Sequence, residues 1–365
     1  MRKKQEGEPK PSNLLYKMFI KWVNKKVKKL FHKLFREEKA GQFVQPLLYA
    51  AQGHAYIETV SNKADTLHRW INKIYEEDIQ ESYRSILAEL APNFRRGKVR
   101  LAIDFKEIGY YGKEDSFFIV GTAYGNKSYR KAFKFITISL LTGTKEERLP
   151  LYALPWHIGQ NLTDAVTNLL QVIRPWFNNI EVVQFDRGFD SWELVYFLEQ
   201  HKIPYLIHKI KHKGKISDLV KQTSSFYRAK YSRTFKMKKR LFRGETNLYI
   251  AKNVRGKDWV FISSLPFTKK EQLVSLYRNR WQIETNYAVS NQNRIMSKSA
   301  NYMHRYFYFI CDMLLQILWR LSGCVHLPFK TFLSCFVMQF KKILKPLLFK
   351  PPERSMRIYS LLALF

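Results

Sequence analysis

The chain has 365 residues, 46% of them hydrophobic, so it can bury the core of one large domain or of two to three smaller ones. It carries 63 Lys and Arg against 30 Asp and Glu, a net charge of +33 that is too large to serve solubility alone. This excess predicts a polyanionic partner, with nucleic acid favoured over a membrane. The three cysteines have neither metal-binding nor disulfide-framework spacing, which excludes a disulfide-stapled secreted protein.

The N-terminal quarter is basic and predicts helices. Residues 13–36 place apolar and Lys side chains at helical spacing, and such a helix can lie on DNA, on an anionic membrane surface or on its own domain. Residues 43–92 predict two or three further helices, and residues 62–75 resemble the second helix of a small helix-turn-helix. We therefore expect residues 1–95 to form a helical, basic, DNA-binding region.

The sequence shows no signal for export or membrane insertion. The N-terminus is charged and no short apolar run follows it. The longest apolar segment, residues 306–319, is too short to span a bilayer and predicts a buried helix. We expect a cytoplasmic, nucleoid-associated protein with no membrane partner.

From residue 98 onward the hydrophobic pattern changes to that of strands. The predicted strands cover residues 98–105, 116–124 and 131–141. Three successive strands of this kind predict an antiparallel meander, and the apolar run of the first one ends on Asp104. Pro150 to Pro155 then predict a connection into a helix at about 163–172.

A second apolar strand, residues 180–185, ends on Asp186. A Gly turn, a helix at 191–199 and a strand at 205–210 follow it. The predicted order is therefore β-β-β-α-β-α-β-α. Since sites in α/β sheets form at the carboxyl ends of strands, the carboxylates at these strand ends are candidate site residues.

The C-terminal third contains a segment without Gly or Pro, residues 268–298, which predicts one long helix with a capping box at Thr268 and Glu271. One face of this helix is formed by Leu273, Tyr277, Arg280, Glu284 and Ala288. A carboxylate on a packing face is costly unless a positive charge meets it. Glu284 therefore predicts either a salt bridge to Arg280 or a functional site.

Three carboxylates carry the predicted chemistry: Asp104, Asp186 and Glu284. Oxygen ligands of this kind suit Mg²⁺, with Mn²⁺ as a possible substitute. Two such ions, about 3.5–4 Å apart, can activate a nucleophile and stabilise the leaving oxygen of a phosphodiester. Each Asp alone is more often an ordinary turn residue, but the joint pattern in a strongly basic chain favours a two-metal site.

The sequence around these residues resembles that of the DDE transposases of insertion sequences. The resemblance is to the group that has a β-strand insertion. Asp186-Arg187-Gly188-Phe189 matches its Asp-Arg-Gly-aromatic signature, while Tyr277, Arg280 and Glu284 match the first three positions of its Tyr-x2-Arg-x3-Glu-x6-Lys signature. The resemblance covers about residues 98–322. It implies an α/β fold, an RNase H-like mixed sheet flanked by helices. The implied domains are a helical region at 1–95, a catalytic domain at 96–210 and 266–325, a β-rich insertion at 211–265 and a basic helical tail at 326–365.

The resemblance also implies a function: metal-dependent DNA cleavage and strand transfer at the ends of an insertion sequence. The implied partners are double-stranded DNA, as transposon ends and target, and a second copy of the chain in a homodimer. Tyr277 and Arg280 are implied to contact DNA near the cleaved strand. Trp259 lies where relatives carry a Trp that stacks on a flipped base, although it can equally be a core residue. Arg187 is expected to contact phosphate or to support the carboxylates.

The sequence departs from the signature at its last position, which holds Asn291 instead of Lys. Arg294 and Lys298 follow on the predicted helix and are expected to supply the phosphate contact instead. Two alternative functions remain open. One is another RNase H-like nuclease, such as a junction resolvase, and the other is a catalytically decayed, basic DNA-binding protein.

Overall fold

The computed structural model divides the chain into two compact units. The helical unit comprises residues 1–86, 293–297 and 318–365, and the sheet unit comprises 87–292 and 298–317. The structure describes residues 29–35, 40–93, 97–122, 128–141, 149–177, 179–210, 214–281, 283, 287, 289, 291–322 and 327–344. Among these residues, no helix is long and apolar enough to cross a membrane.

The helical unit is built from short helices around an aromatic core. Its helices are α2 (Ala40–Gly53), α3 (Ile57–Val60), α4 (Ala64–Ile71), most of α5 (Glu76–Leu90) and α12 (Phe329–Leu344). Helix α2 packs on α12, where Gln52 Nε2 donates to Ser334 Oγ at 2.9 Å. Phe35 contacts Phe43 and Trp70 at ring-centroid distances of 5.8 and 5.2 Å. Of the predicted helix at 13–36, residues 29–35 are described and helical, and they bury Leu30, Phe31, Leu34 and Phe35.

The long helix predicted at 268–298 is not continuous. Helix α9 covers Lys270–Arg278, a 3₁₀ turn covers Asn279–Trp281, and the backbone is non-helical from Asn293. The capping box is unused, because Lys269 is the N-cap residue. Further on, Met296 exchanges backbone hydrogen bonds of 2.8 and 3.0 Å with Ile57 and Ala55. Tertiary backbone pairing inside the helical unit therefore overrides the helical pattern of this segment.

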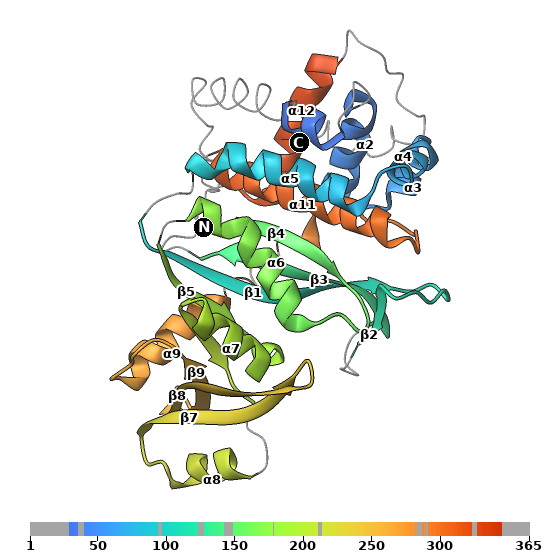
Figure 1. Ribbon diagram of the computed structural model, residues 1–365. Coiled ribbons are helices and arrows are strands. Elements are labelled where there is room, and N and C mark those ends of the chain that lie inside the picture. Colours follow the sequence, from blue (N-terminus) through green and yellow to red (C-terminus); the bar gives the residue numbers. More distant parts are fainter. Residues whose placement is uncertain are drawn as a thin grey trace, which may run out of the picture. The chain divides into compact units, whose positions relative to one another are not determined.

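The sheet unit contains a nine-stranded mixed sheet (Figure 1), which confirms the predicted fold class. Its strands are β1 (Val99–Tyr110), β2 (Ile119–Gly121), β3 (Lys131–Leu140), β4 (Leu149–Trp156), β5 (Ile180–Phe185), β6 (Tyr205–His208), β7 (Phe226–Met237), β8 (Arg240–Val254) and β9 (Lys257–Ser263). The order is β2-β3-β1-β5-β6-β9-β8-β7, and β4 pairs with β3. Strand β4 lies where the two prolines predict a connection. Both are tolerated because β4 pairs only with β3, as an edge strand.

At the centre of the sheet, β1 and β5 run parallel. Ile103 lies opposite Phe185, so Asp104 within β1 and Asp186 directly after β5 lie at the same level. The prediction that the first strand ends on Asp104 is wrong, because β1 continues to Tyr110 in its pairing with β3. Neighbouring strands are about 4.8 Å apart. The topology therefore brings together two carboxylates that are 82 positions apart in the sequence.

The strands after β6 continue the same sheet. Strand β9 pairs antiparallel with β6, and β8 and β7 add a long hairpin. Helices α7 (Trp192–Gln200) and α9 cover opposite faces of this part. Phe242 and Gly244 of β8 meet α7, whereas Tyr249 belongs to the core under α9, and alternate side chains of a strand point to opposite faces.

Two of the remaining helices of the sheet unit match the sequence pattern, whereas the third lies inside the predicted β-rich insertion, where no helix was predicted. Helix α6 covers Leu162–Ile173 and begins at Asn161, whose side chain accepts from Asp164 N at 3.0 Å. Helix α8 covers Lys215–Gln222. In the part of α11 (Tyr302–Leu321) that belongs to the sheet unit, Tyr306 Oη donates to Ala153 O of β4 at 2.9 Å.

Candidate active site

The first site element is the middle of β1, where Asp104 lies. Asp104 is 17% exposed and its Oδ1 accepts from the backbone N of Phe105 at 2.8 Å. Phe105 stacks on Phe189 at a centroid distance of 4.9 Å. Phe189 belongs to the turn after β5, and its backbone N donates to Asp186 O at 3.0 Å. The two aromatic rings thus lock the segment after Asp104 against the turn after Asp186.

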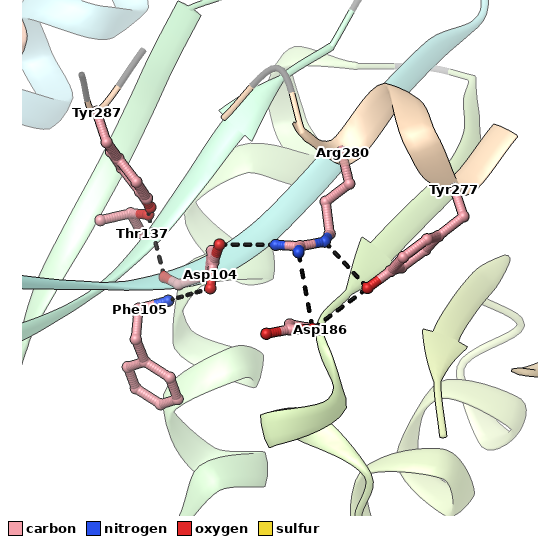
Figure 2. A network of polar contacts seen from close by, with 7 residues as sticks. All are labelled: Asp104, Phe105, Thr137, Asp186, Tyr277, Arg280 and Tyr287. Carbon is pink, nitrogen blue, oxygen red and sulfur yellow. Dashed lines mark hydrogen bonds and ion pairs between the residues drawn. The ribbon is translucent and has the colours of Figure 1, made fainter. Parts of the chain in front are cut away.

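Arg280 joins the two carboxylates (Figure 2). One guanidinium nitrogen donates to Asp104 Oδ2 at 2.8 Å, and the other lies 3.7 Å from Asp186 Oδ1. The Arg280 side chain is only 5% exposed. A buried guanidinium needs carboxylate partners, and two carboxylates this close need a cation between them. The guanidinium group and the two carboxylates therefore stabilise one another.

Tyr277 completes this group of polar contacts. Its hydroxyl donates to Asp186 Oδ1 at 3.2 Å and accepts from Arg280 Nε at 3.2 Å. Burial raises the pKa of Tyr277 well above its ordinary value, so the phenol stays neutral and remains a donor. Its helix is fixed to the strand that carries Asp186, because Gln184 Nε2 donates to Leu276 O at 3.0 Å.

The third predicted carboxylate, Glu284, lies outside the described residues. Within the described part of the chain, no three His, Cys, Asp or Glu side chains are grouped closely enough to hold a metal ion. Asp104 and Asp186 nevertheless converge on one cation, the Arg280 guanidinium. Their donor set consists of carboxylate oxygens, which fits a hard divalent cation such as Mg²⁺.

A comparison with protein families identifies the family of proteins that carries this site. The family described as Transposase DDE domain matches residues 95–308, which include both aspartates, Tyr277 and Arg280. The chain belongs to this transposase family. The DDE transposase is therefore an enzyme of polynucleotidyl transfer that acts on DNA, and its family uses divalent metal ions. Nothing in the comparisons favours another nuclease or a decayed DNA-binding protein.

A solved structure with the same fold supports the architecture. The piggyBac transposase, in a cryo-EM structure of its synaptic complex with hairpin DNA, matches with a TM-score of 0.57. The sequence identity is 14%, and the match covers 95% of this chain and 82% of that chain. A comparison with curated proteins finds no match. At this identity the similarity is one of fold.

The transposase has a second set of contacts around Asp104 that the sequence did not predict. Thr137 Oγ1 of β3 donates to Asp104 O at 3.1 Å, and it shares a hydrogen bond with the Tyr287 hydroxyl (Figure 2). Burial, with a contribution from the Asp104 charge, raises the pKa of Tyr287, so this phenol is also neutral. Lys106 Nζ lies 4.7 Å from the Tyr287 ring centroid and donates to Asn291 Oδ1 at 2.6 Å. The one local signal for this set is a Lys two residues after Asp104, on the same face of the strand.

A buried ion pair anchors the next strand. Lys209 Nζ lies 2.7 and 3.0 Å from the Asp190 carboxylate oxygens, and both side chains are 6% exposed. The same carboxylate accepts from Ile210 N at 3.3 Å. Asp190 follows the turn after Asp186, so this pair connects the turn to the end of β6.

The predicted DNA-contact residues lie in different environments. Arg187 is exposed in the 3₁₀ turn beside Asp186. Tyr277 and Arg280 are buried, and they contact the carboxylates of Asp186 and Asp104. The expectation that Arg294 and Lys298 continue the signature helix is wrong, because both follow the point at which the helix ends. Arg294 lies in the extended segment of the helical unit, where its backbone N donates to His54 Nδ1 at 3.3 Å.

Trp259 lies in the core of the sheet unit. It is 8% exposed, its ring packs 6.0 Å from both Phe261 and Tyr277, and its indole N–H donates to Val254 O at 3.2 Å. The indole therefore supports the residue that holds Asp186. The sequence left two roles open for Trp259, core packing and base stacking. This environment is that of a core residue.

Trp259→Ala is expected to destabilise the transposase by about 3 kcal/mol, because a large buried ring is replaced by a cavity. All activities should then fall together with the melting temperature. A thermal melt and a time course of nicked and double-strand-cut products on a transposon-end duplex measure both quantities. An unchanged melt with selective loss of the second cut would instead assign Trp259 to base stacking.

Proposed function

We propose that the transposase cleaves DNA and transfers strands at the ends of an insertion sequence, with two Mg²⁺ ions held by Asp104, Asp186 and Glu284. The observation that supports this most directly is the convergence of Asp104, within β1, and Asp186, directly after the parallel strand β5, on one cation. When bound, Mg²⁺ or Mn²⁺ supplies positive charge for the attacking and leaving oxygens of the phosphodiester.

The chain's own residues prepare this site. Arg280 keeps two carboxylates close that would otherwise repel each other, and Tyr277 orients Asp186 through its hydroxyl. Near a bound DNA strand, Arg280 and the exposed Arg187 are expected to contact phosphate oxygens, since a guanidinium binds them in a bidentate manner. The test is cleavage of a duplex made from the DNA that flanks the gene, with and without Mg²⁺.

The β7–β8 hairpin presents a surface suited to the DNA backbone. Between residues 226 and 245 it carries eight Lys and Arg and one Glu. All eight are exposed: Arg228, Lys230, Arg233, Lys236, Lys238, Lys239, Arg240 and Arg243. Lys230 lies 3.4 Å from Glu245. Aromatic side chains between them anchor the hairpin to α7: Tyr231 packs 5.1 Å from Trp192, and Phe242 packs 5.3 Å from Tyr196.

This surface, named here the basic hairpin, is proposed to bind phosphates of the transposon end. Cations that project from a rigid, anchored hairpin lose little freedom when they meet a polyanion. The proposal extends to assembly and location. A homodimer would hold two transposon ends, residues 1–95 would add DNA contacts, and the chain would be associated with the nucleoid.

Lys236→Gln combined with Arg243→Gln should weaken DNA binding and make it less sensitive to salt. Each phosphate contact contributes about −0.9 to the slope of log K against log salt, so the slope should become shallower by about 1.8. Fluorescence anisotropy with a labelled duplex at several salt concentrations measures this change. Lys221→Gln on α8, an exposed Lys whose Nζ lies 3.9 Å from Asp218, is the matched control. Equal slopes for all three proteins would remove the basic hairpin from the DNA interface.

A further inference from the structure

The buried ion pair of Lys209 and Asp190 is hard to explain by stability alone. The Lys209 ammonium group lies 2.7 and 3.0 Å from the two Asp190 carboxylate oxygens, and both side chains are 6% exposed. Removing two charges from water is costly, and well-packed apolar residues of similar volume are often as stable or more so. What the charges add is a fixed geometry, because the carboxylate accepts both from Nζ and, at 3.3 Å, from Ile210 N.

The pair closes the turn that begins at Asp186. Asp186 is the N-cap residue of the 3₁₀ turn Arg187–Phe189, and Asp190 is its C-cap residue. Asp190 N donates to Arg187 O at 3.2 Å, and Phe189 N donates to Asp186 O at 3.0 Å. Only the three residues of this turn separate Asp186 from Asp190, so a displacement of Asp190 also displaces the backbone of Asp186.

Lys209 is held in place by several strands of the sheet. It directly follows β6, and its backbone N donates to Val260 O of β9 at 2.9 Å. Its Nζ lies 5.5 Å from the ring centroid of Tyr231 on β7, and this ring packs 5.1 Å from that of Trp192. Trp192 begins α7, two residues after Asp190. The sheet therefore anchors the turn, through β6, β7 and β9.

The Asp186 carboxylate depends on such an anchor more than Asp104 does. Asp186 Oδ1 lies 3.2 Å from the Tyr277 hydroxyl and 3.7 Å from Arg280, whereas Asp104 Oδ2 lies 2.8 Å from Arg280. The Asp186 side chain is 35% exposed, against 17% for Asp104. Its side-chain contacts are thus longer and fewer of its atoms are covered, so its direction depends on the backbone of the turn.

We propose that Asp190 and Lys209 are positioning residues of the metal site, which keep Asp186 directed at Asp104 before a metal ion or DNA binds. The inference rests on the proposed two-metal function and deepens it. Lys209 acts through Asp190, and Asp190 acts through the turn. Removal of such a partner behind a metal ligand typically lowers metal affinity or activity by about 10- to 100-fold.

The test is Asp190→Asn combined with Lys209→Met. This double variant removes both charges together, so no unpaired charge is left in the interior, and the Asn side-chain oxygen can still accept from Ile210 N. Its melting temperature without divalent ions should stay close to that of the wild type. Titration of the DNA-free protein with Mn²⁺, followed by electron paramagnetic resonance, should give a dissociation constant at least about tenfold higher than that of the wild type. The Mg²⁺ concentration that half-saturates cleavage should rise by a similar factor.

Two further variants serve as controls. Asp218→Asn combined with Lys221→Met removes an exposed pair, 3.9 Å apart, from α8 and should bind Mn²⁺ like the wild type. Lys209→Arg keeps the charge and should retain most of the affinity that the double variant loses. Without divalent ions, the slope of log K for DNA against log salt should be the same in the double variant and the wild type, since Lys209 is assigned no phosphate contact.

Mn²⁺ binding by the double variant as tight as that of the wild type overturns the inference. So does a slope that is shallower by about 0.9, because Lys209 would then contact a phosphate directly. A wild-type protein that binds no Mn²⁺ refutes the proposed metal site, and the inference with it. If the double variant does not fold, Lys209→Gln takes its place, because its amide can still donate to Asp190. It should bind Mn²⁺ about tenfold more weakly, and unchanged binding overturns the proposal.

Discussion

Asp104→Asn should leave DNA binding almost unchanged and slow cleavage by at least about 10³-fold. The amide keeps the shape of the side chain, and its single oxygen can still accept either from Arg280 or from Phe105 N, which now bond to different oxygens of Asp104. It is, however, a poor ligand for a hard cation. Metal ions contribute several kcal/mol to transition-state stabilisation, and each 1.36 kcal/mol corresponds to a factor of ten in rate. Single-turnover cleavage and anisotropy binding with the same duplex measure the two effects.

Asp186→Asn should behave in the same way, since its carboxylate shares the Arg280 cation with Asp104. Asp218→Asn, at an exposed position on α8, is the control and should cleave at the wild-type rate. Loss of binding and of the folded state together in Asp104→Asn would assign Asp104 a role in folding rather than in metal binding.

Arg280→Met should destabilise the metal-free protein by about 3–5 kcal/mol, the usual effect of removing one partner from a buried ion pair. Asp104 and Asp186 would then face each other without the guanidinium that now bridges them. Cleavage should also fall, because the two carboxylates would no longer be held close together before DNA binds. Thermal or urea unfolding in a chelating buffer measures the loss.

Divalent ions should restore much of this stability. A ligand that binds only the folded state stabilises it by about 2.7 kcal/mol at 100 times its dissociation constant. Mg²⁺ should therefore raise the melting temperature of Arg280→Met more than that of the wild type, in which the guanidinium competes for the same oxygens. Arg174→Met, at an exposed position, should change stability by less than about 0.5 kcal/mol. Equal Mg²⁺ shifts in wild type and Arg280→Met would show that the two carboxylates do not form the cation site.

The positions of Asp104 and Asp186 could be predicted from the sequence because the relevant signal is local. Each one follows an apolar run, and the parallel pairing of these two runs brings the residues after them together, although β1 continues beyond Asp104 to Tyr110. The cation that joins them could not be predicted in the same way. Arg280 lies 176 positions after Asp104, and on a helix pattern its nearest carboxylate is Glu284. Only the packed sheet shows that Arg280 faces Asp104 and Asp186.

Other differences have identifiable physical causes. Strand β7 carries aromatic, basic and small residues in no regular alternation, so its sequence gives no clear strand pattern, although Tyr231 packs on α7. The two prolines of β4 argue against a strand in the sequence, but β4 tolerates them because it lies at the edge of the sheet. The helical period of the signature segment predicts that Arg294 lies on the same helix. The backbone of this segment instead pairs with residues 55–57. In each case, tertiary pairing outweighs a local preference.

The unbroken hydrogen bonding from β5 through β6, β9 and β8 to β7 has a mechanical consequence. Asp186 at the end of β5 and the basic hairpin belong to one sheet, so neither can shift without the other. Four strand spacings of about 4.8 Å separate β5 from β7, which gives an offset of roughly 19 Å. Successive phosphates of one DNA strand are about 3.4 Å apart along the helix axis, so this offset corresponds to about five or six nucleotides. If the basic hairpin binds the transposon end as proposed, we expect the sheet to fix the distance along the DNA between this contact and the point of cleavage.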